Sequence, residues 1–220
     1  MERILEPEVM DTREEAEAYD EMDHAEVNTA FVEHIIELGA SEGRFLDLGT
    51  GPAQIPILLA QRRPKIQVIA IDLSLNMLRL GEKHVAKAGL ADRISLEQVD
   101  AKYLPYPNES FDGVISNSII HHLPDPMSAL REIGRVSRPG SLILMRDLIR
   151  PETPEAAQAL VEQYAGDDTP YQKKLFYDSF LASLTIPEME GMLAQVNLAG
   201  AVVLQSSDRH WSIERATGNG

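Results

Sequence analysis

The sequence contains no cysteine in its 220 residues. It therefore forms no disulfide, and it offers no thiolate for metal binding or nucleophilic catalysis. Chains without disulfides are typical of reducing compartments, so we expect a cytoplasmic location.

Long apolar runs are also missing. No stretch approaches the roughly 20 apolar residues that a membrane-spanning helix needs, so we expect no membrane partner. The amino terminus, Met1–Pro7, lacks the basic start and apolar core of a signal peptide. With 44% hydrophobic and 25% charged residues, the composition is that of a globular protein. The length suits one domain over residues 1–220.

Basic residues are scarce relative to acidic ones. The chain has 20 Lys and Arg against 35 Asp and Glu, a formal net charge of −15. Such a charge repels a phosphate backbone unless a local basic patch compensates. The densest basic stretches, 62–65 and 173–174, are short. We therefore expect a small-molecule substrate and no nucleic-acid partner.

Residues 45–60 read as a strand, a glycine turn and a helix. The strand carries Asp47, the turn is Gly49-Thr50-Gly51, and a helix can begin at Pro52. Such a turn can hold a nucleotide-like ligand at the helix amino terminus. A dinucleotide site has a third glycine where this chain has Gln54, and Asp47 would oppose a pyrophosphate. The turn instead suits a cationic ligand such as S-adenosylmethionine (SAM), and a purely structural turn is the alternative.

Further strand signals alternate with helical ones. The strand Gln67–Asp72 ends in an acid about twenty residues beyond the glycine turn, the spacing at which an acid reaches a ribose. Ser74 can cap a helix over 75–87, and Gly89 can end it. The other strands are expected at 93–99, 111–116, 142–145 (after a helix to Ser137 and a turn at 138–141), 201–205 and 209–215. The pattern predicts an α/β fold with a doubly wound, mostly parallel seven-stranded sheet and a C-terminal antiparallel hairpin.

Helical segments flank the expected ligand-binding core, residues 41–147. Residues 1–40 are expected to form a helical lid, with Thr12 capping a helix over 13–20. Asn28 is expected to cap a second helix whose core-facing residues are Val27, Phe31, Ile35 and Leu38. The acidic segment 8–26 is either a solvated helix face or a lid that orders over the cofactor. Residues 151–185 form either a packed helical insertion or a substrate cap, and 186–216 a closing helix, from Pro187 to Leu198, and hairpin.

Four motifs in this order resemble the class I SAM-dependent methyltransferases of small molecules, such as the ubiquinone/menaquinone methyltransferases. They are Asp47–Gly51, Ile71–Ser74 with Met77-Leu78, Asp100-Ala101, and Phe111-Asp112 followed by Asn117 and His121-His122-Leu123. The resemblance covers residues 43–147 firmly and the closing hairpin more loosely. One departure is Ala53, where the family often has a third small glycine.

The resemblance implies a Rossmann-like fold and a role for each motif. Asp47 and the Gly49-Thr50-Gly51 backbone would hold the methionine end of SAM, and Asp72 the ribose hydroxyls. Leu73 and Met77 would lie against the adenine, Asp100 and the Ala101 N–H would bind its edge, and Asn117 would lie beside the sulfonium. S-adenosylhomocysteine would be the product. We therefore expect a SAM-dependent methyltransferase. The alternatives are a nicotinamide oxidoreductase and a SAM-binding regulatory subunit without turnover.

The acceptor side is predicted from strand ends that share one crevice. Asn117, one of His121 and His122, and Arg146 could face the transferred methyl. The histidine could remove a proton, and Arg146 could hold an acidic substrate group. Alternatively, one histidine only caps the next helix and Arg146 only pairs with an acid. The remaining candidates are Tyr19 and His24 as substrate-binding residues; His121, His122 and Asp125 could ligate a metal, but no metal is expected.

Overall fold

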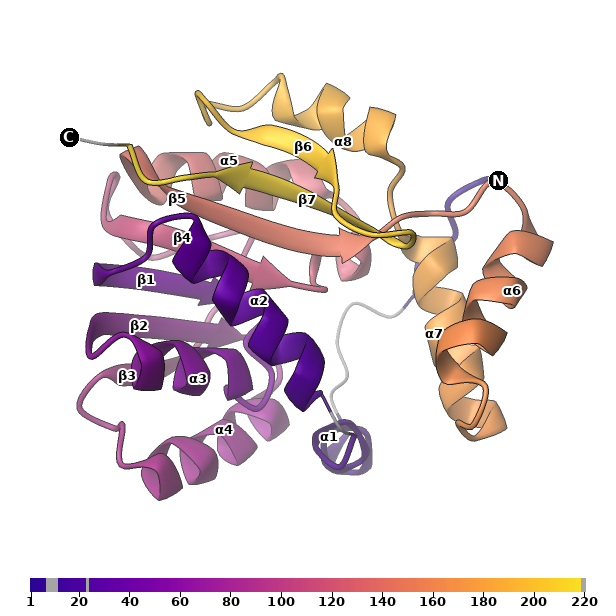
Figure 1. The fold of residues 1–220 in the computed structure, drawn as a ribbon, viewed down its shortest axis with the longest axis horizontal. Coiled ribbons are helices and arrows are strands. Elements are labelled where there is room, and N and C mark those ends of the chain that lie inside the picture. The colour runs from indigo at the N-terminus through magenta and orange to yellow at the C-terminus, as the bar shows by residue number, and fades with distance from the viewer. Residues whose placement is uncertain (7–11, 23, 219–220) are drawn as a thin grey trace.

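The strands of this protein form one seven-stranded sheet in the order β3-β2-β1-β4-β5-β7-β6 (Figure 1). The computed structural model describes residues 1–6, 12–22 and 24–218. The parallel strands are β1 (Glu42–Leu48), β2 (Lys65–Asp72), β3 (Ile94–Gln98), β4 (Phe111–Asn117) and β5 (Ser137–Leu148). The last strand, β7 (His210–Arg215), runs antiparallel to both β5 and β6 (Val202–Gln205). The predicted doubly wound sheet with a closing antiparallel hairpin is confirmed.

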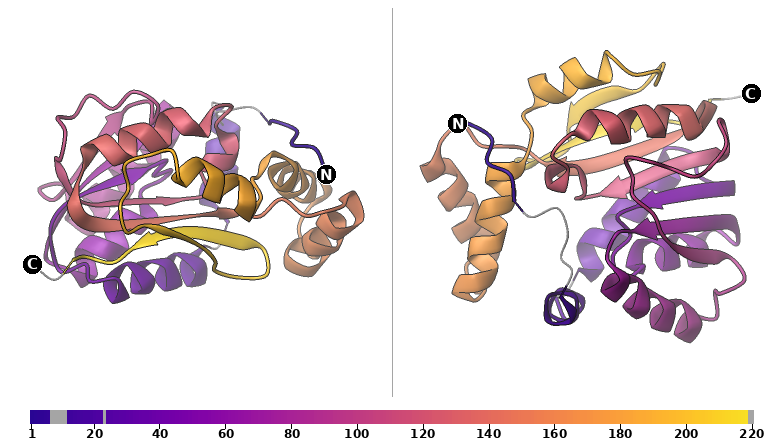
Figure 2. Two further views of the ribbon diagram at one scale, coloured as in Figure 1. Left: turned by 90° about the horizontal axis from the view of Figure 1, so that it is seen from above. Right: turned by 180° about the vertical axis from the view of Figure 1, so that it is seen from behind.

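Helices bury both faces of the sheet (Figure 2). One face packs against α2 (Ala25–Glu37), α3 (Gln54–Arg62) and α4 (Leu75–Ala88), and the other against α5 (Pro126–Val136) and α8 (Ile186–Leu193). Successive residues of β1 serve opposite faces, since Phe45 belongs to the first core and Leu46 to the second. Burial on both faces explains why the strands read as continuous apolar runs.

Two further helices, α6 (Pro154–Ala165) and α7 (Pro170–Ala182), pair at the carboxyl ends of the parallel strands (Figures 1 and 2). They have a small core of their own, which contains Val161 and Phe180. Residues 1–6 run beside α7, where the Ile4 N–H donates to the Leu181 carbonyl at 3.0 Å. The amino terminus therefore lies at the same edge of the sheet as the predicted site.

The helix predicted over 13–20 is confirmed as α1 (Arg13–Asp20), with Thr12 and Glu15 forming a reciprocal capping box. It lies against α4. The predicted cap and end of α4 are also confirmed, because Ser74 accepts from the Met77 N–H and Gly89 follows in the left-handed region. The lid prediction for 8–26 also includes residues 8–11 and 23, which lie outside the described residues.

The prediction for the second helix is wrong at its start. α2 begins at Ala25, so Asn28 is not its cap; the Asn28 amide instead donates to the Gln54 side chain at 2.8 Å. Val27 is 42% exposed, whereas Phe31 and Ile35 are buried. Because the helix starts one turn earlier than predicted, Val27 lies in its first turn and is exposed to solvent.

Three other boundaries also differ. α3 begins at Gln54, not at Pro52, because Ala53 adopts the left-handed conformation (φ 62°) first. The expected turn at 138–141 belongs to β5, where Ser137 already pairs with Phe111 and the register then shifts. Proline and glycine are tolerated there because they lie at the irregular start of the strand. α8 ends at Leu193, short of the predicted Leu198.

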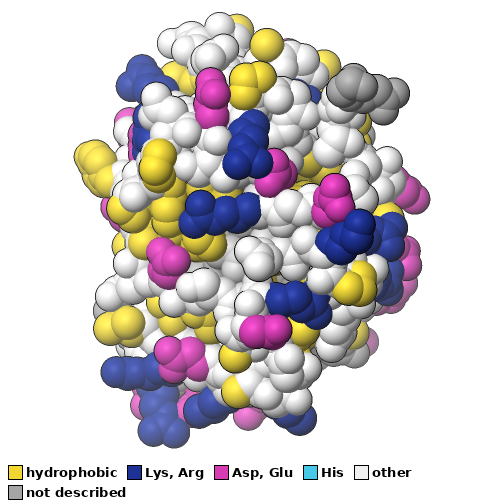
Figure 3. Space-filling view, turned by 90° about the vertical axis from the view of Figure 1, so that its left-hand side faces the viewer, with side chains coloured by type: hydrophobic (Ala, Val, Ile, Leu, Met, Phe, Trp, Pro, Cys, Tyr) yellow, Lys and Arg dark blue, Asp and Glu magenta, His cyan; other side chains and the backbone are white. Residues whose placement is uncertain are grey.

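The face at the amino ends of the parallel strands carries Lys and Arg side chains interspersed with Asp and Glu (Figure 3). No continuous stripe of one sign crosses this view. Within the described ranges, the helices are all too short or too polar to cross a membrane.

Candidate functional site

The turn after β1 is tight because two glycines adopt left-handed conformations, Gly49 with φ +66° and Gly51 with φ +54°. A Cβ on Gly49 would lie 2.8 Å from the Ile119 side chain, so packing also requires glycine there. A Cβ on Gly51 would meet nothing closer than the Tyr19 ring, at 3.8 Å. The turn therefore brings the β1 strand end close to the segment after β4 and leaves open space beside Gly51.

A cavity of about 120 Å³ lies over this turn at the carboxyl ends of β1, β2 and β4. Eight of its lining residues belong to the predicted cofactor set: Gly49, Gly51, Asp72, Leu73, Met77, Asp100, Ala101 and Asn117. Tyr19 of α1 and His122 also line it. The structure thus brings the separate sequence motifs into one pocket.

Asp72 is held by the two turns that flank it. Its Oδ2 accepts from the Gly51 N–H at 2.9 Å, and its Oδ1 accepts from the Ser74 N–H at 2.8 Å. Burial raises the pKa of Asp72, and these backbone donors oppose the rise. Each carboxylate oxygen can accept a further hydrogen bond, so Asp72 remains able to bind ligand hydroxyls.

Asp47 lies beneath the pocket rather than on its wall. It is 2% exposed, and its Oδ2 has no hydrogen-bond partner among the described residues. Burial raises its pKa to about 7, and the nearby Asp72 carboxylate adds to the rise. Thr50 is also buried; its N–H donates to the Ile71 carbonyl, which ties the turn to β2. These two residues support the turn from below.

The acids around the pocket fit SAM, whose ammonium and sulfonium groups are cationic. An unpaired buried carboxylate oxygen on Asp47 is the kind of group that a cationic ligand stabilises. On the pocket wall, Asp100 Oδ1 accepts from the Lys102 N–H at 2.9 Å. Leu73 and Met77 supply an apolar wall next to Asp100, which suits an adenine ring.

Asn117 and Arg146 form a pair at the ends of β4 and β5. Arg146 Nε donates to Asn117 Oδ1 at 3.0 Å, and the guanidinium lies 4.9 Å from the centroid of the Phe31 ring. Arg146 is not among the pocket-lining residues, so it lies behind Asn117. Burial lowers the pKa of Arg146 to about 10, and the positive charge of Arg209 contributes. No acidic side chain of the described residues forms an ion pair with Arg146.

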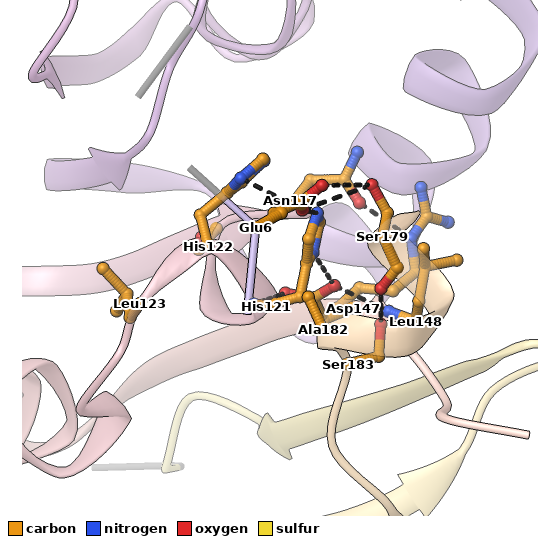
Figure 4. Close-up of polar contacts among 12 residues, drawn as sticks. Glu6, Asn117, His121, His122, Leu123, Asp147, Leu148, Ser179, Ala182 and Ser183 are labelled. Atoms are coloured by element: carbon orange, nitrogen blue, oxygen red, sulfur yellow. Dashed lines mark hydrogen bonds and ion pairs between the residues drawn. The ribbon is translucent and has the colours of Figure 1, made fainter. Parts of the chain in front are cut away.

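The two adjacent histidines lie in different surroundings (Figure 4). The His121 side chain is 5% exposed, and its Nδ1 lies 2.5 Å from Asp147 Oδ1, while its backbone N–H donates to Asp147 Oδ2 at 3.0 Å. Burial alone would lower the pKa of His121, but Asp147 and Glu6 raise it above its ordinary value. His121 is absent from the pocket wall, whereas His122 lines the pocket.

Glu6 joins this cluster from the amino terminus, and the sequence motifs did not indicate it. Its Oε1 lies 3.3 Å from His121 Nε2 and 3.2 Å from His122 Nδ1 (Figure 4). Burial raises the pKa of Glu6, and His121 opposes the rise. A contact between residues more than a hundred positions apart leaves no local pattern in one sequence.

Other predicted candidates lie elsewhere. His24 lines a second cavity with Met22 and His84, and its ring lies 4.8 Å from that of Tyr19. Asp125 caps α5, where its oxygens accept from the Met127 N–H and the Ser128 hydroxyl. Glu6, not Asp125, is the acid whose oxygen lies within 4.8 Å of a nitrogen of both His121 and His122.

Comparisons with known proteins agree with this geometry. A family model described as a methyltransferase domain matches residues 40–216. Methyltransferase GfsG of Streptomyces halstedii is 30% identical over 191 residues, which cover 84% of this chain and 68% of that protein. A demethylmenaquinone methyltransferase of Lactiplantibacillus plantarum is 34% identical over 116 residues, which cover 52% of this chain and 49% of that protein. The chain thus spans about two thirds of the first relative and half of the second.

A solved structure of a SAM-dependent methyltransferase from Aquifex aeolicus has the same fold. It aligns with a TM-score of 0.68 at 20% identity and covers 94% of this chain and 99% of that chain. This chain therefore belongs to the methyltransferase domain family, and the Rossmann-like SAM-dependent methyltransferase predicted from its motifs is confirmed.

Proposed function

We propose that this protein transfers the methyl group of SAM to a small molecule that carries an acidic group. One observation carries the proposal: a single cavity is lined by the cofactor motifs and also by Asn117 and His122. In the ligand-bound enzyme, Asp72 would face the ribose and Asp100 the adenine, and Asp47 would act on the ammonium group through its charge from beneath the turn. SAM supplies a methyl group that its sulfonium already activates.

The protein's own contribution is positioning and removal of one proton. Asn117 is fixed by Arg146 at 3.0 Å and would orient the reacting groups, and holding two reactants in line accounts for much of such a rate. His122 would take the proton from the acceptor's nucleophilic atom as that atom bonds to the methyl carbon. The methylated acceptor, S-adenosylhomocysteine and one proton on His122 then balance the reaction.

The acidic group is inferred from Arg146. Burial lowers the pKa of Arg146, the positive charge of Arg209 adds to the fall, and Asp147 opposes it. Burial also lowers the pKa of His210 to about 4, and both arginines contribute. The adjacent acid, Asp147, is engaged with His121 at 2.5 Å. Because Arg146 lies behind Asn117 and its Nε is engaged there, a carboxylate or phosphate on the acceptor would have to reach past Asn117 to the two Nη groups, where a two-pronged contact would supply the missing counter-charge.

The relatives support a small-molecule acceptor, because one of them is named for demethylmenaquinone and another for 27-O-demethylrifamycin SV. The net charge of −15 supports the absence of a nucleic-acid partner. A cytoplasmic location remains a prediction from the cysteine-free composition. A nicotinamide oxidoreductase has no support from the turn, which lacks the third glycine.

A screen of small acids with methyl-labelled SAM tests the function. We expect label transfer to at least one carboxylate- or phosphate-bearing compound, and much weaker transfer to its uncharged ester or amide. Arg146→Ala should lose that preference. Transfer to neutral compounds alone would refute the acidic acceptor. SAM binding without transfer to any compound would favour a regulatory subunit.

The cofactor assignment predicts that Asp72→Ala weakens SAM binding by about ten- to a hundred-fold, the cost of losing hydrogen bonds to a charged acceptor. Titration calorimetry measures the affinity. Asp92→Ala is the matched control, because Asp92 is an exposed acid of the α4–β3 connection and does not line the pocket; this variant should bind SAM normally. Equal affinity in the wild type and Asp72→Ala would disprove the ribose role.

A further inference from the structure

Residues 1–6 are tied to the rim of the pocket by several contacts. Arg3 Nε donates to the Ala182 carbonyl at 2.6 Å, and its Nη2 donates to the His121 and Leu123 carbonyls at 3.2 and 2.9 Å. The Ile4 N–H donates to the Leu181 carbonyl. These contacts join α7 to the segment after β4 and fix the backbone just before Glu6.

Glu6 is held at its tip as well as at its backbone. Its Oε1 lies 3.3 Å from His121 Nε2 and 3.2 Å from His122 Nδ1, and both carboxylate oxygens lie 3.3 Å from Ser179 Oγ. The side chain is 10% exposed. Burying a charged carboxylate is unfavourable unless hydrogen bonds or opposite charges compensate for the lost water. The contacts with Ser179 and the two histidines supply that compensation here.

His121 anchors this carboxylate rather than acting on a substrate. Its Nδ1 faces Asp147 and its Nε2 faces Glu6, so both nitrogens are engaged when the ring is an imidazolium. The two rings, His121 and His122, lie with centroids 4.1 Å apart. The result is a chain of contacts from Asp147 through His121 and Glu6 to His122, which alone of the four lines the pocket.

We propose that Glu6 is the positioning residue for His122: its carboxylate lies 3.2 Å from Nδ1, an ion-pair contact without the alignment of a hydrogen bond, and favours the ring that carries its proton on Nδ1. Nε2 is then the atom that takes the acceptor's proton. The partner of one ring nitrogen decides which tautomer a neutral histidine adopts. A carboxylate beside Nδ1 favours the tautomer with the proton on Nδ1, because a carboxylate accepts and cannot donate. The negative carboxylate also stabilises the imidazolium that forms after proton transfer. This inference rests on the proposed function only for the identity of the proton donor.

Other charged groups face the cluster and set its balance. Arg3 and His121 bring positive charge, and Asp147 brings a negative charge, from the amino-terminal segment, the segment after β4, and β5. On α7, the negative charge of Asp178 repels the Glu6 carboxylate and the positive charge of Lys174 attracts it. Because His121 and Arg3 offset Asp147, removal of Glu6 would remove the negative charge that lies against His122.

The test uses the whole protein and needs no known acceptor. Long-range ¹H–¹⁵N correlation spectra of the histidine rings report which nitrogen carries the proton. We expect His122 in the wild type to be protonated at Nδ1 when neutral, and Glu6→Gln to lose that single tautomer, because an amide can donate as well as accept. Glu2→Gln, an exposed acid on the same segment, should keep the wild-type spectrum.

Two results would overturn the proposal. One is a wild-type His122 protonated at Nε2 when neutral, and this result does not depend on any variant folding. The other is tight Zn²⁺ binding to the wild type that Glu6→Gln abolishes, which would make the cluster a metal site. A failed acceptor screen with the predicted tautomer would instead refute only the proposed function.

Once an acceptor is known, kinetics provide a second readout. Glu6→Gln should lower turnover by roughly ten- to a hundred-fold, less than loss of the base itself, with SAM affinity unchanged. The acidic limb of its pH profile should move to lower pH, because the imidazolium loses its carboxylate. An unchanged pH profile would assign Glu6 a structural role.

Discussion

Replacing His122 with alanine is expected to lower turnover by about 10²–10⁴-fold, the usual contribution of a general base. The reason is its place, since it is the one of the two adjacent histidines that lines the pocket. SAM affinity should stay unchanged, because the cofactor contacts are assigned to Asp47, Asp72 and Asp100. Single-turnover rates at saturating SAM measure the effect, and calorimetry measures the affinity.

His34→Ala is the matched control for this variant. His34 lies on α2 with a 39% exposed side chain, and its partners are Glu37 and Glu214 rather than any pocket residue. Its turnover should equal that of the wild type. Near-normal turnover in His122→Ala would mean that the site works by positioning alone, as happens when the acceptor is already deprotonated in solution.

The cofactor half of the site was predictable because its signals are local. The Gly49-Thr50-Gly51 turn and the acid at the end of β2 each follow a strand that the apolar pattern marks. Parallel strands then bring their carboxyl ends to one edge, so adjacency follows from topology. The sequence alone therefore predicts that Asp72 and Asp100 lie in one pocket.

The acceptor half was predictable only in outline. The sequence indicated two histidines but could not divide their roles, because the division depends on the short 3₁₀ turn Ile120–His122 that points them differently. Glu6 gave no signal, since its contact with His121 spans 115 positions and depends on how residues 1–6 pack against α7. His24 was predicted from its place near Tyr19 in sequence, yet α2 starts one turn early and directs it toward another cavity.

Replacing His121 with alanine is expected to lower the free energy of unfolding by about 3–5 kcal/mol, because it leaves the buried Asp147 carboxylate without its partner. The side chains of His121 and Asp147 are 5% and 1% exposed, and their 2.5 Å contact is the shortest in the cluster. Urea denaturation followed by circular dichroism measures the loss. The double variant His121→Ala with Asp147→Ala should be less destabilised than the sum of the two single variants, since the two residues share one interaction.

The pH dependence of this loss follows from the two pKa shifts. The pKa of His121 is raised in the folded state, so its contribution is complete below its unfolded value of about 6.5 and disappears as pH rises through the folded value. The pKa of Asp147 is lowered, so its contribution is complete above about 3.9 and disappears as pH falls through the folded value. The stability difference between the wild type and His121→Ala should therefore be largest between about pH 4 and 6.5 and should shrink toward alkaline pH. A difference that stays constant from pH 5 to pH 9 would show that His121 stabilises the fold by packing rather than by its charge.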